Sequence, residues 1–305
     1  MTVVTGFLGA GKTTLVNRWL AGIPRGDVAV IVNEHGDVGI DGELLAERAR
    51  AVVEITGGCV CCATQAELVR ALEEMAARKD PPKRVLVETS GAASPAGVLR
   101  AIAGGGPSGA FELDGVVTVV DPGRVDVLAE EDLAVEQLGY ADVAVLSRAD
   151  ASTPETMARA RDVVIEHNGA AVVVEAPPVA TLDAVLDQRR ADLPPRDVPA
   201  AHAHHVYESV SLALDGDVDG ERFADFMETD LARFAGRLFR TKGILAVEGS
   251  GERMIVQGVA DLVEVTFGAP WRDARRTSRL VVVGFGLDRA ALEKGFAACA
   301  AGGGA

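Results

Sequence analysis

The sequence predicts an α/β fold, in which helices flank a mostly parallel β-sheet, followed by a smaller α+β domain. Three observations lead to this prediction. In the first two thirds of the 305 residues, short runs of Val, Ile and Leu alternate with helical patterns, which is typical of parallel strands covered on both faces. Paired prolines at 177–178 and 194–195 interrupt this alternation. The length also allows two domains, each with its own core.

The first domain is expected to span 1–190. Its strands are predicted at 2–5, 28–33, 51–55, 84–88, 115–121, 141–147 and 170–176. Its helices are predicted from about Lys12, where the apolar side chains share one face, and at 63–79, 132–140 and 154–167. Thr64 and Glu67 have the spacing of a capping box, which places a helix start at Thr64.

The second domain is expected at 205–300, after a polar, His-containing linker at 191–204. Apolar segments occur at 205–214, 236–248, 253–267 and 279–286. Helical patterns lie around 220–235 and at 288–299. Together they predict the smaller α+β domain.

Composition excludes several classes of function. Lys and Arg number 30 against 45 Asp and Glu, which gives a net charge of −15; binding to nucleic acid phosphates needs a basic patch. The N-terminus lacks the pattern of a signal peptide, and no apolar run is long enough to span a membrane. We therefore expect a cytoplasmic protein, in which clustered cysteines indicate metal or redox chemistry rather than a disulfide.

The segment GFLGAGKTT fits the phosphate-binding pattern G-x-x-x-x-G-K-[ST] with Gly6, Gly11, Lys12 and Thr13. It follows a predicted strand and opens a predicted helix, which is the context that this motif requires. The backbone N–H groups would surround phosphate oxygens, Lys12 would reach the β- and γ-phosphates, and the Thr13 hydroxyl would bind Mg²⁺. The alternative is a glycine turn that matches by chance. The motif predicts a P-loop nucleotide-binding fold.

An acidic residue that serves Mg²⁺ is expected at a strand end. Glu88 and Gly91, in VLVETSG, form an E-x-x-G motif, whereas Asp121 ends another strand and competes for the role; the spacing to Gly91 favours Glu88. Guanine recognition commonly uses N-K-x-D, and SRAD, from Ser147 to Asp150, takes that place here. The sequence therefore favours GTP over ATP only through Asp150.

Three of the four cysteines lie within GGCVCC, at Cys59, Cys61 and Cys62. Two or three thiolates suit Zn²⁺ or another soft divalent ion. A following helix would favour the thiolate form of Cys62. Buried inert cysteines or a redox dithiol are the alternatives, and the absence of C-x-x-C favours metal.

These segments, in the order GFLGAGKTT, NEHGDVGID, GGCVCC, ETSGAASP, DGVVTVVD and SRAD, resemble the CobW-type GTPases, P-loop proteins related to the nickel-insertion GTPases of hydrogenase and urease assembly. The resemblance continues into the second domain with LFRTKGIL and VVVGFGLD. It implies a GTP-hydrolysing metallochaperone or metal-site activator that delivers Zn²⁺ or Co²⁺ to a client metalloprotein. The site residues it implies are Gly9, Ala10, Gly11, Lys12, Thr13 and Thr14 for phosphates, Thr13 and Glu88 for Mg²⁺, Asp150 for guanine, and Cys59, Cys61 and Cys62 for the transferred metal.

Three departures from the family pattern matter. The usual NEFGE reads NEHGD, which introduces His35 and shortens the second carboxylate to Asp37. SRAD replaces N-K-x-D. The His-rich run of many relatives is reduced to His202, His204 and His205, for which a solvated linker is the simpler interpretation.

We expect Mg·GTP to order a switch that spans 34–41, and the cysteines lie between this switch and E-x-x-G. Hydrolysis would use a water that Glu34, Asp37 or Asp41 orients, with Lys12 and Glu88 at the phosphates. No arginine finger is identifiable, so slow turnover is expected. A metal sensor that delivers nothing and a P-loop kinase with structural cysteines are the alternatives. The expected partner is a client apo-enzyme, and a homodimer is a further assembly that the sequence permits.

Overall fold

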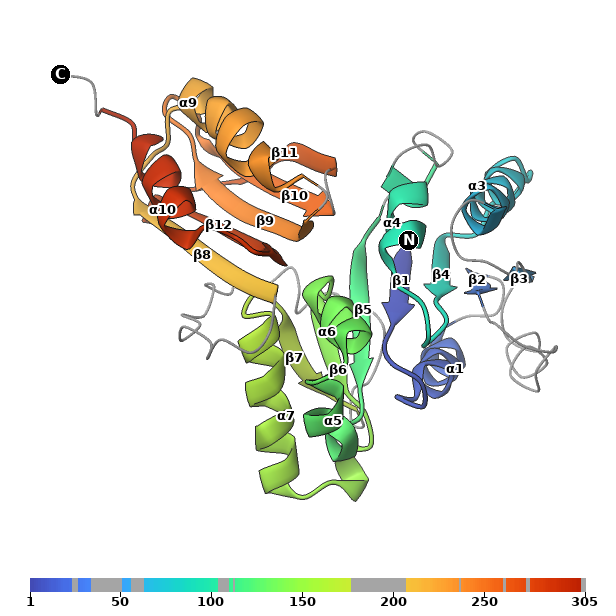
Figure 1. The fold of residues 1–305 in the computed structure, drawn as a ribbon. Coiled ribbons are helices and arrows are strands. Elements are labelled where there is room, and N and C mark those ends of the chain that lie inside the picture. Colours follow the sequence, from blue (N-terminus) through green and yellow to red (C-terminus); the bar gives the residue numbers. More distant parts are fainter. Residues whose placement is uncertain are drawn as a thin grey trace. The chain divides into compact units, whose positions relative to one another are not determined.

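The computed structural model describes residues 1–23, 27–33, 51–55, 63–103, 110–111, 113–176, 207–235, 237–259, 262–272 and 275–302. The chain divides into two compact units, each built around a sheet of its own (Figure 1). This confirms the predicted α/β fold with an additional α+β domain. The predicted linker at 191–204 lies outside the described residues, and the domain boundaries stay predictions.

The first unit contains a seven-stranded sheet in the order β3-β2-β4-β1-β5-β6-β7. Every pair of neighbouring strands in it is parallel. The strands are β1 (Thr2–Thr5), β2 (Val28–Asn33), β3 (Ala51–Ile55), β4 (Arg84–Glu88), β5 (Gly115–Val120), β6 (Val143–Leu146) and β7 (Val172–Glu175). Their bounds agree with the predicted strands to within two residues at each end.

Helices cover both faces of this sheet. The α-helices are α1 (Lys12–Gly22), α3 (Ala63–Ala76), α4 (Ala96–Ala103), α5 (Val125–Leu128), α6 (Asp132–Gly139) and α7 (Pro154–His167). The short 3₁₀ helices are η1 (Pro122–Arg124) and η2 (Ala149–Ala151). Apolar residues of α1, such as Trp19, pack on Val143 and Val145, whereas α6 and α7 pack on the alternate β6 residues Ala144 and Leu146. Because successive strand residues point to opposite faces, nearly continuous apolar strands bury both.

One predicted boundary was wrong. Helix α3 begins at Ala63, so Thr64 is already a helical residue and not its N-cap. The capping-box spacing was matched, but the helix starts one residue earlier than the pattern suggested.

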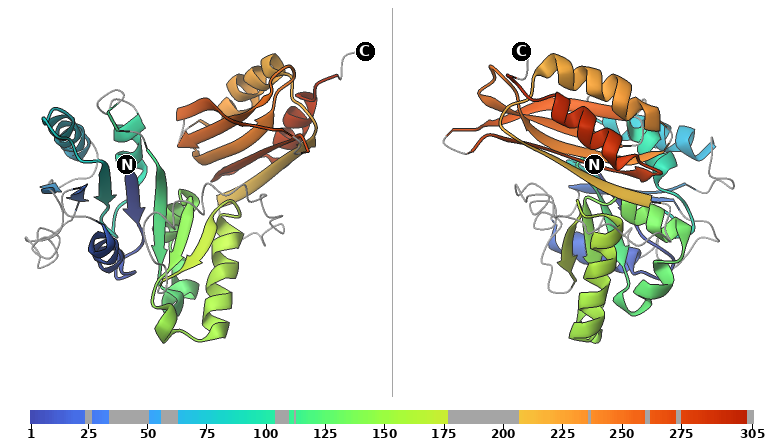
Figure 2. Two further views of the ribbon diagram at one scale, coloured as in Figure 1. Left: turned by 180° about the vertical axis from the view of Figure 1, so that it is seen from behind. Right: turned by 60° about the vertical axis from the view of Figure 1, so that its left-hand side comes forward.

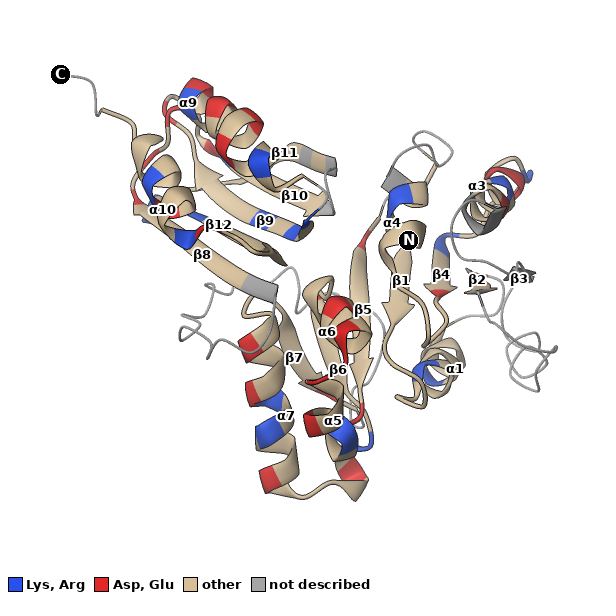
Figure 3. Ribbon diagram, viewed as in Figure 1, with Lys and Arg blue, Asp and Glu red and all other residues tan. Residues whose placement is uncertain are grey.

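Both acidic and basic residues occur along α7, as Figure 3 shows. Arg159 on this helix pairs with Asp126 at 2.8 Å, and Arg161 pairs with Glu175. Such exposed pairs contribute little stability individually. No helix in the described ranges combines the length and the apolar composition that crossing a bilayer would require.

The second unit contains a five-stranded antiparallel sheet in the order β11-β10-β9-β12-β8. Its strands are β8 (Tyr207–Asp215), β9 (Leu238–Ala246), β10 (Glu252–Val259), β11 (Leu262–Pro270) and β12 (Thr277–Phe285). The apolar segment 253–267 thus contains parts of two strands. The helical pattern around 220–235 is divided into α9 (Gly220–Asp225), the π-helix η3 (Phe226–Leu231) and the 3₁₀ helix η4 (Ala232–Phe234). After β12, the last helix in the described residues is α10 (Arg289–Ala298).

Helices α9 and α10 lie on the same face of the antiparallel sheet (Figure 2). Three phenylalanines form the centre of this layer, with ring centroids 5.9–6.5 Å apart: Phe223, Phe226 and Phe296. They pack with alternate residues of β8 and β12, such as Leu212 and Leu280. One sheet face, α9, α10 and the short helices η3 and η4 therefore supply the core of this unit.

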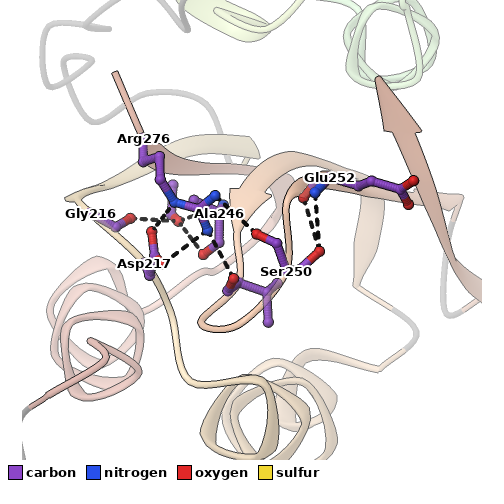
Figure 4. Close-up of polar contacts among 8 residues, drawn as sticks. Gly216, Asp217, Ala246, Ser250, Glu252 and Arg276 are labelled. Atoms are coloured by element: carbon purple, nitrogen blue, oxygen red, sulfur yellow. Dashed lines mark hydrogen bonds and ion pairs between the residues drawn. The ribbon is translucent and has the colours of Figure 1, made fainter. Parts of the chain in front are cut away.

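A second set of contacts joins the turns of this unit around Arg276 (Figure 4). The Arg276 guanidinium donates to both carboxylate oxygens of Asp217, at 2.6 and 2.9 Å. It also donates to the carbonyls of Ser250 and Val247, each at 2.9 Å, and lies 5.9 Å from the Trp271 ring centroid. Hydrogen bonding to Asp217 raises the pKa of Arg276 above its ordinary value.

Candidate functional site

The carboxyl ends of β4, β1, β5 and β6 meet at one edge of the parallel sheet because these strands are neighbours with the same direction. Four predicted site segments follow these ends directly: the loop 6–11 after β1, Glu88 at the end of β4, Asp121 after β5, and SRAD after β6. The sheet topology therefore gathers motifs that are more than a hundred residues apart in sequence.

The loop at 6–11 needs glycine at its first position. Gly6 has a φ of +136°, and a Cβ placed there would lie 2.3 Å from the Val119 carbonyl oxygen of β5. Only a residue without a side chain can pass this close to a neighbouring strand. At the other end, Gly11 caps helix α1 with a φ of 98°, so the loop is closed between β1 and the N-terminus of α1.

Lys12 bends back over this loop. Its side chain is buried, and the ammonium group donates to the Gly6 carbonyl at 2.8 Å and to the Phe7 carbonyl at 3.4 Å. A buried cation held by neutral carbonyls, beside a helix N-terminus, is suited to a phosphate oxygen.

Thr13 and Glu88 are in direct contact. The Thr13 hydroxyl donates to Glu88 Oε1 at 2.7 Å, and Glu88 is 2% exposed. A hydroxyl and a carboxylate supply the hard oxygen ligands that Mg²⁺ prefers. The donor chemistry of this pair therefore fits the ion.

Gly91 lies directly against the 6–11 loop and the Lys12 side chain. A Cβ at this position would lie 2.7 Å from the Leu8 backbone nitrogen and 2.8 Å from the Lys12 ammonium nitrogen. The E-x-x-G spacing thus places its carboxylate against Thr13 and its glycine against the loop backbone.

Asp121, the competing carboxylate, contacts a different group. Its Oδ2 accepts from Arg148 Nη1 at 2.5 Å, and Arg148 Nη2 donates to the Gly9 carbonyl at 3.1 Å. Arg124 Nη1 donates to the Leu8 carbonyl at 3.0 Å. The sequence interpretation missed Arg124 because no motif includes it, and it considered Arg148 only as the replacement for the lysine of N-K-x-D, which can also stack on a base.

The remaining nucleotide-site predictions lie around the loop. Ala10 is buried and Thr14 is exposed in the first turn of α1. Ser147 Cβ lies 3.8 Å from a Cβ placed on Gly11, and its buried hydroxyl has no hydrogen-bond partner among the described residues. Asp150 is exposed in η2. The structure therefore places SRAD beside the loop, with the carboxylate of Asp150 on the outside.

Several predicted residues lie outside the described part of the chain. These are Glu34, His35, Asp37, Asp41, Cys59, Cys61, Cys62, His202, His204 and His205. Within the described ranges, no group of three or more His, Cys, Asp or Glu side chains is arranged as a metal site. The metal and switch residues stay predictions.

Comparison with known proteins identifies what the chain is similar to. Residues 1–175 match the family described as CobW/HypB/UreG, nucleotide-binding domain, and residues 207–300 match the cobalamin synthesis protein cobW C-terminal domain. The zinc chaperone CobW of Pseudomonas aeruginosa is 33% identical over 96% of this chain and 89% of its own. The zinc chaperone YjiA of Escherichia coli is 29% identical over 97% of both chains. The crystal structure of Zn(II)-bound YjiA GTPase from E. coli has a TM-score of 0.73 at 25% identity and covers 98% of both chains.

Proposed function

Because the chain belongs to the CobW/HypB/UreG nucleotide-binding family and carries the CobW C-terminal domain, we propose that it is a metallochaperone that passes a divalent transition metal to a client metalloprotein. The chain is a GTPase. Since similar proteins are named zinc chaperones, we infer Zn²⁺ as the metal it carries, with Co²⁺ as the alternative.

The residues of the loop would act on the phosphates of GTP as follows. Lys12 would exchange its bonds to the Gly6 and Phe7 carbonyls for phosphate oxygens, and its charge would stabilise the negative charge that moves to the leaving β-phosphate. Thr13 and Glu88 would hold Mg²⁺, which neutralises phosphate charge when bound. Ser147 and Asp150 would face the base, and Glu34, Asp37 or Asp41 would orient the attacking water.

The positions at which β2 and β3 end support a coupling between nucleotide binding and metal binding. In the register of the sheet, Asn33 pairs with Ile55, and Val32 pairs with Glu88. The last residues of β2, β3 and β4 therefore lie side by side. The sequence with Glu34 and Asp37 follows Asn33 directly, and the sequence with the cysteines follows Ile55.

This arrangement supports a reciprocal coupling. If the γ-phosphate orders the segment after β2, the neighbouring cysteine segment after β3 should change its thiolate spacing, and with it the affinity for the metal. By linkage, bound metal must change the affinity for GTP by the same factor.

The test is an anaerobic titration of the reduced protein with Co²⁺ and then Zn²⁺. It is done with a non-hydrolysable GTP analogue, with GDP and without nucleotide, always with Mg²⁺. We expect thiolate-to-cobalt absorption whose midpoint depends on the nucleotide in the wild type, and its loss in Cys61→Ser. Cys299→Ala is the matched control, since Cys299 is buried in the second unit. Equal, weak binding in every nucleotide state would contradict the proposal.

Two further readouts separate the alternatives. A chaperone should release Zn²⁺ to a chromogenic chelator at a rate that changes between the GTP-analogue and GDP states, whereas a sensor should keep its metal in both. A kinase should turn over GTP only when an acceptor is added, whereas GTP hydrolysis without any acceptor contradicts that alternative.

A further inference from the structure

The carboxylate of Asp121, directly after β5, is buried, with 4% of the residue exposed. Its Oδ1 accepts from the Gly123 N–H at 3.1 Å, and its Oδ2 accepts from Arg148 at 2.5 Å. Neither contact is with Thr13, whose hydroxyl donates to Glu88 instead. The two contacts of Asp121 are therefore with the turn that contains Gly123 and with the side chain of Arg148.

The first contact fixes the turn that presents Arg124. Asp121 is the N-cap of η1, because its side chain accepts from Gly123 N and its carbonyl accepts from Arg124 N at 3.1 Å. The side chain of Arg124, at the end of this turn, donates to the Leu8 carbonyl at 3.0 Å. The cap therefore sets where this guanidinium meets the phosphate-binding loop.

The second contact fixes Arg148. This residue has a φ of 52°, in the left-handed region that residues other than glycine seldom adopt. Such a strained backbone persists only where surrounding contacts hold it. Two of these contacts are made by the guanidinium itself, to Asp121 and to the Gly9 carbonyl.

The two arginines thus hold successive carbonyls of the loop, those of Leu8 and Gly9. The C=O and N–H groups of a trans peptide point in opposite directions, so holding the Leu8 carbonyl also sets the direction of the Gly9 N–H. In addition, the two arginines together with Asp121 leave one net positive charge beside the loop, in a chain with a net charge of −15. This charge lowers the local repulsion that a polyphosphate would meet.

We propose that Asp121 is a positioning residue, which holds Arg124 and Arg148 on the phosphate-binding loop and thereby keeps the loop in the shape that receives the nucleotide. The proposal rests on the GTPase function above and assigns Asp121 no part in binding Mg²⁺. It concerns affinity for GDP and GTP alike, since the arginines contact the loop backbone and not the site of the γ-phosphate.

The test compares Asp121→Asn with Glu88→Gln, and measures the affinity of fluorescent GDP and of a non-hydrolysable GTP analogue in Mg²⁺ and in EDTA. We expect Asp121→Asn to weaken binding about tenfold in both solutions, because a hydrogen bond to a charged group is lost. Glu88→Gln should weaken binding only when Mg²⁺ is present. If the effect of Asp121→Asn disappears in EDTA, Asp121 serves the metal; if it is absent in both, Asp121 is only a cap. Either outcome overturns the proposal.

A coupling measurement tests whether Asp121 acts through the arginines. The double variant Arg124→Gln, Arg148→Gln should weaken nucleotide binding at least as much as Asp121→Asn does. Adding Asp121→Asn to the double variant should change the nucleotide affinity less than twofold. A full additional tenfold loss would contradict the proposal.

Two controls accompany these variants. Arg159→Gln removes one charge from an exposed ion pair on α7 and should leave the affinity unchanged. The variants at 124 and 148 alter exposed side chains, so they remain informative even if Asp121→Asn unfolds. A wild-type protein that binds neither nucleotide would refute the GTPase function itself, which is a different result.

Discussion

Arg148–Asp121 in the first unit and Arg276–Asp217 in the second are both arginine–aspartate pairs, but their guanidinium groups make different further contacts. Arg276 donates to Asp217 twice and to two backbone carbonyls within the second unit. Arg148 donates once to Asp121 and once to Gly9. The side chain of Arg276 is 32% exposed, whereas that of Arg148 is 57% exposed.

The difference shows that the role of such an ion pair depends on what the arginine's other N–H groups bind. The other N–H groups of Arg276 donate to the Ser250 and Val247 carbonyls within the same unit, so the pair should stabilise that unit. The second donor of Arg148 holds a loop whose shape matters for a ligand, so its pair should affect binding more than stability.

The largest effect is expected from Arg276→Ala. Removing this guanidinium takes both donors from the Asp217 carboxylate and one from the Ser250 carbonyl, whereas the Val247 carbonyl keeps the Ser250 N–H at 3.0 Å. The loss should lower the free energy of unfolding of the second unit by about 2–4 kcal/mol. The chain has two tryptophans, of which Trp271 belongs to this unit. Urea unfolding followed by Trp271 fluorescence in a Trp19→Phe background measures the change, while nucleotide affinity in the wild-type background should stay the same.

Arg275→Ala is the matched control for this prediction. Arg275 pairs with Asp215 at 2.9 Å, but the two side chains are 77% and 75% exposed. Because exposed pairs are screened by water, we expect a loss below about 0.5 kcal/mol. Equal losses at 275 and 276 would mean that the backbone contacts of Arg276 contribute nothing.

A loss of nucleotide affinity without loss of stability in the second unit is expected from Gly91→Ala. The added methyl group would meet the Leu8 backbone and the Lys12 ammonium group at 2.7–2.8 Å. Displacing them should cost about 2 kcal/mol, or roughly thirtyfold in affinity. Gly251→Ala, where no atom lies within 4 Å of the added Cβ, should bind fluorescent GDP as the wild type does.

The smallest effect is expected from Cys299→Ala, which should change how the free energy of unfolding depends on pH. Burial, together with the nearby Asp230 carboxylate, raises the pKa of this thiol to about 11. The unfolded chain would ionise the thiol near pH 9, so its contribution to stability is full below pH 9 and is lost as pH rises toward 11. Unfolding free energies from pH 8 to 11 should therefore fall less steeply for Cys299→Ala than for the wild type; parallel curves would show that the thiol is not shifted.

Much of the nucleotide site was predictable because its signals are local. The spacing of Gly6, Gly11, Lys12 and Thr13 between a strand and a helix defines the loop within a few residues. Glu88 could be preferred to Asp121 from the spacing to Gly91 alone, and the contact of Glu88 with Thr13 agrees with that preference. The start of α3 could not be placed to the residue, because a spacing of side chains does not fix where the backbone becomes helical.

By itself, the sequence determined the alternation of strands and helices, the phosphate loop and the family, since hydrophobic period and motif spacing are written in neighbouring residues. Only the tertiary structure showed which groups Asp121, Arg124 and Arg148 contact. The contacts of Arg124 with Leu8 and of Arg148 with Gly9 join residues 116 and 139 positions apart. Such pairs meet because parallel strands bring their carboxyl ends to one edge of the sheet, and no pattern of neighbouring residues specifies which side chains will touch there.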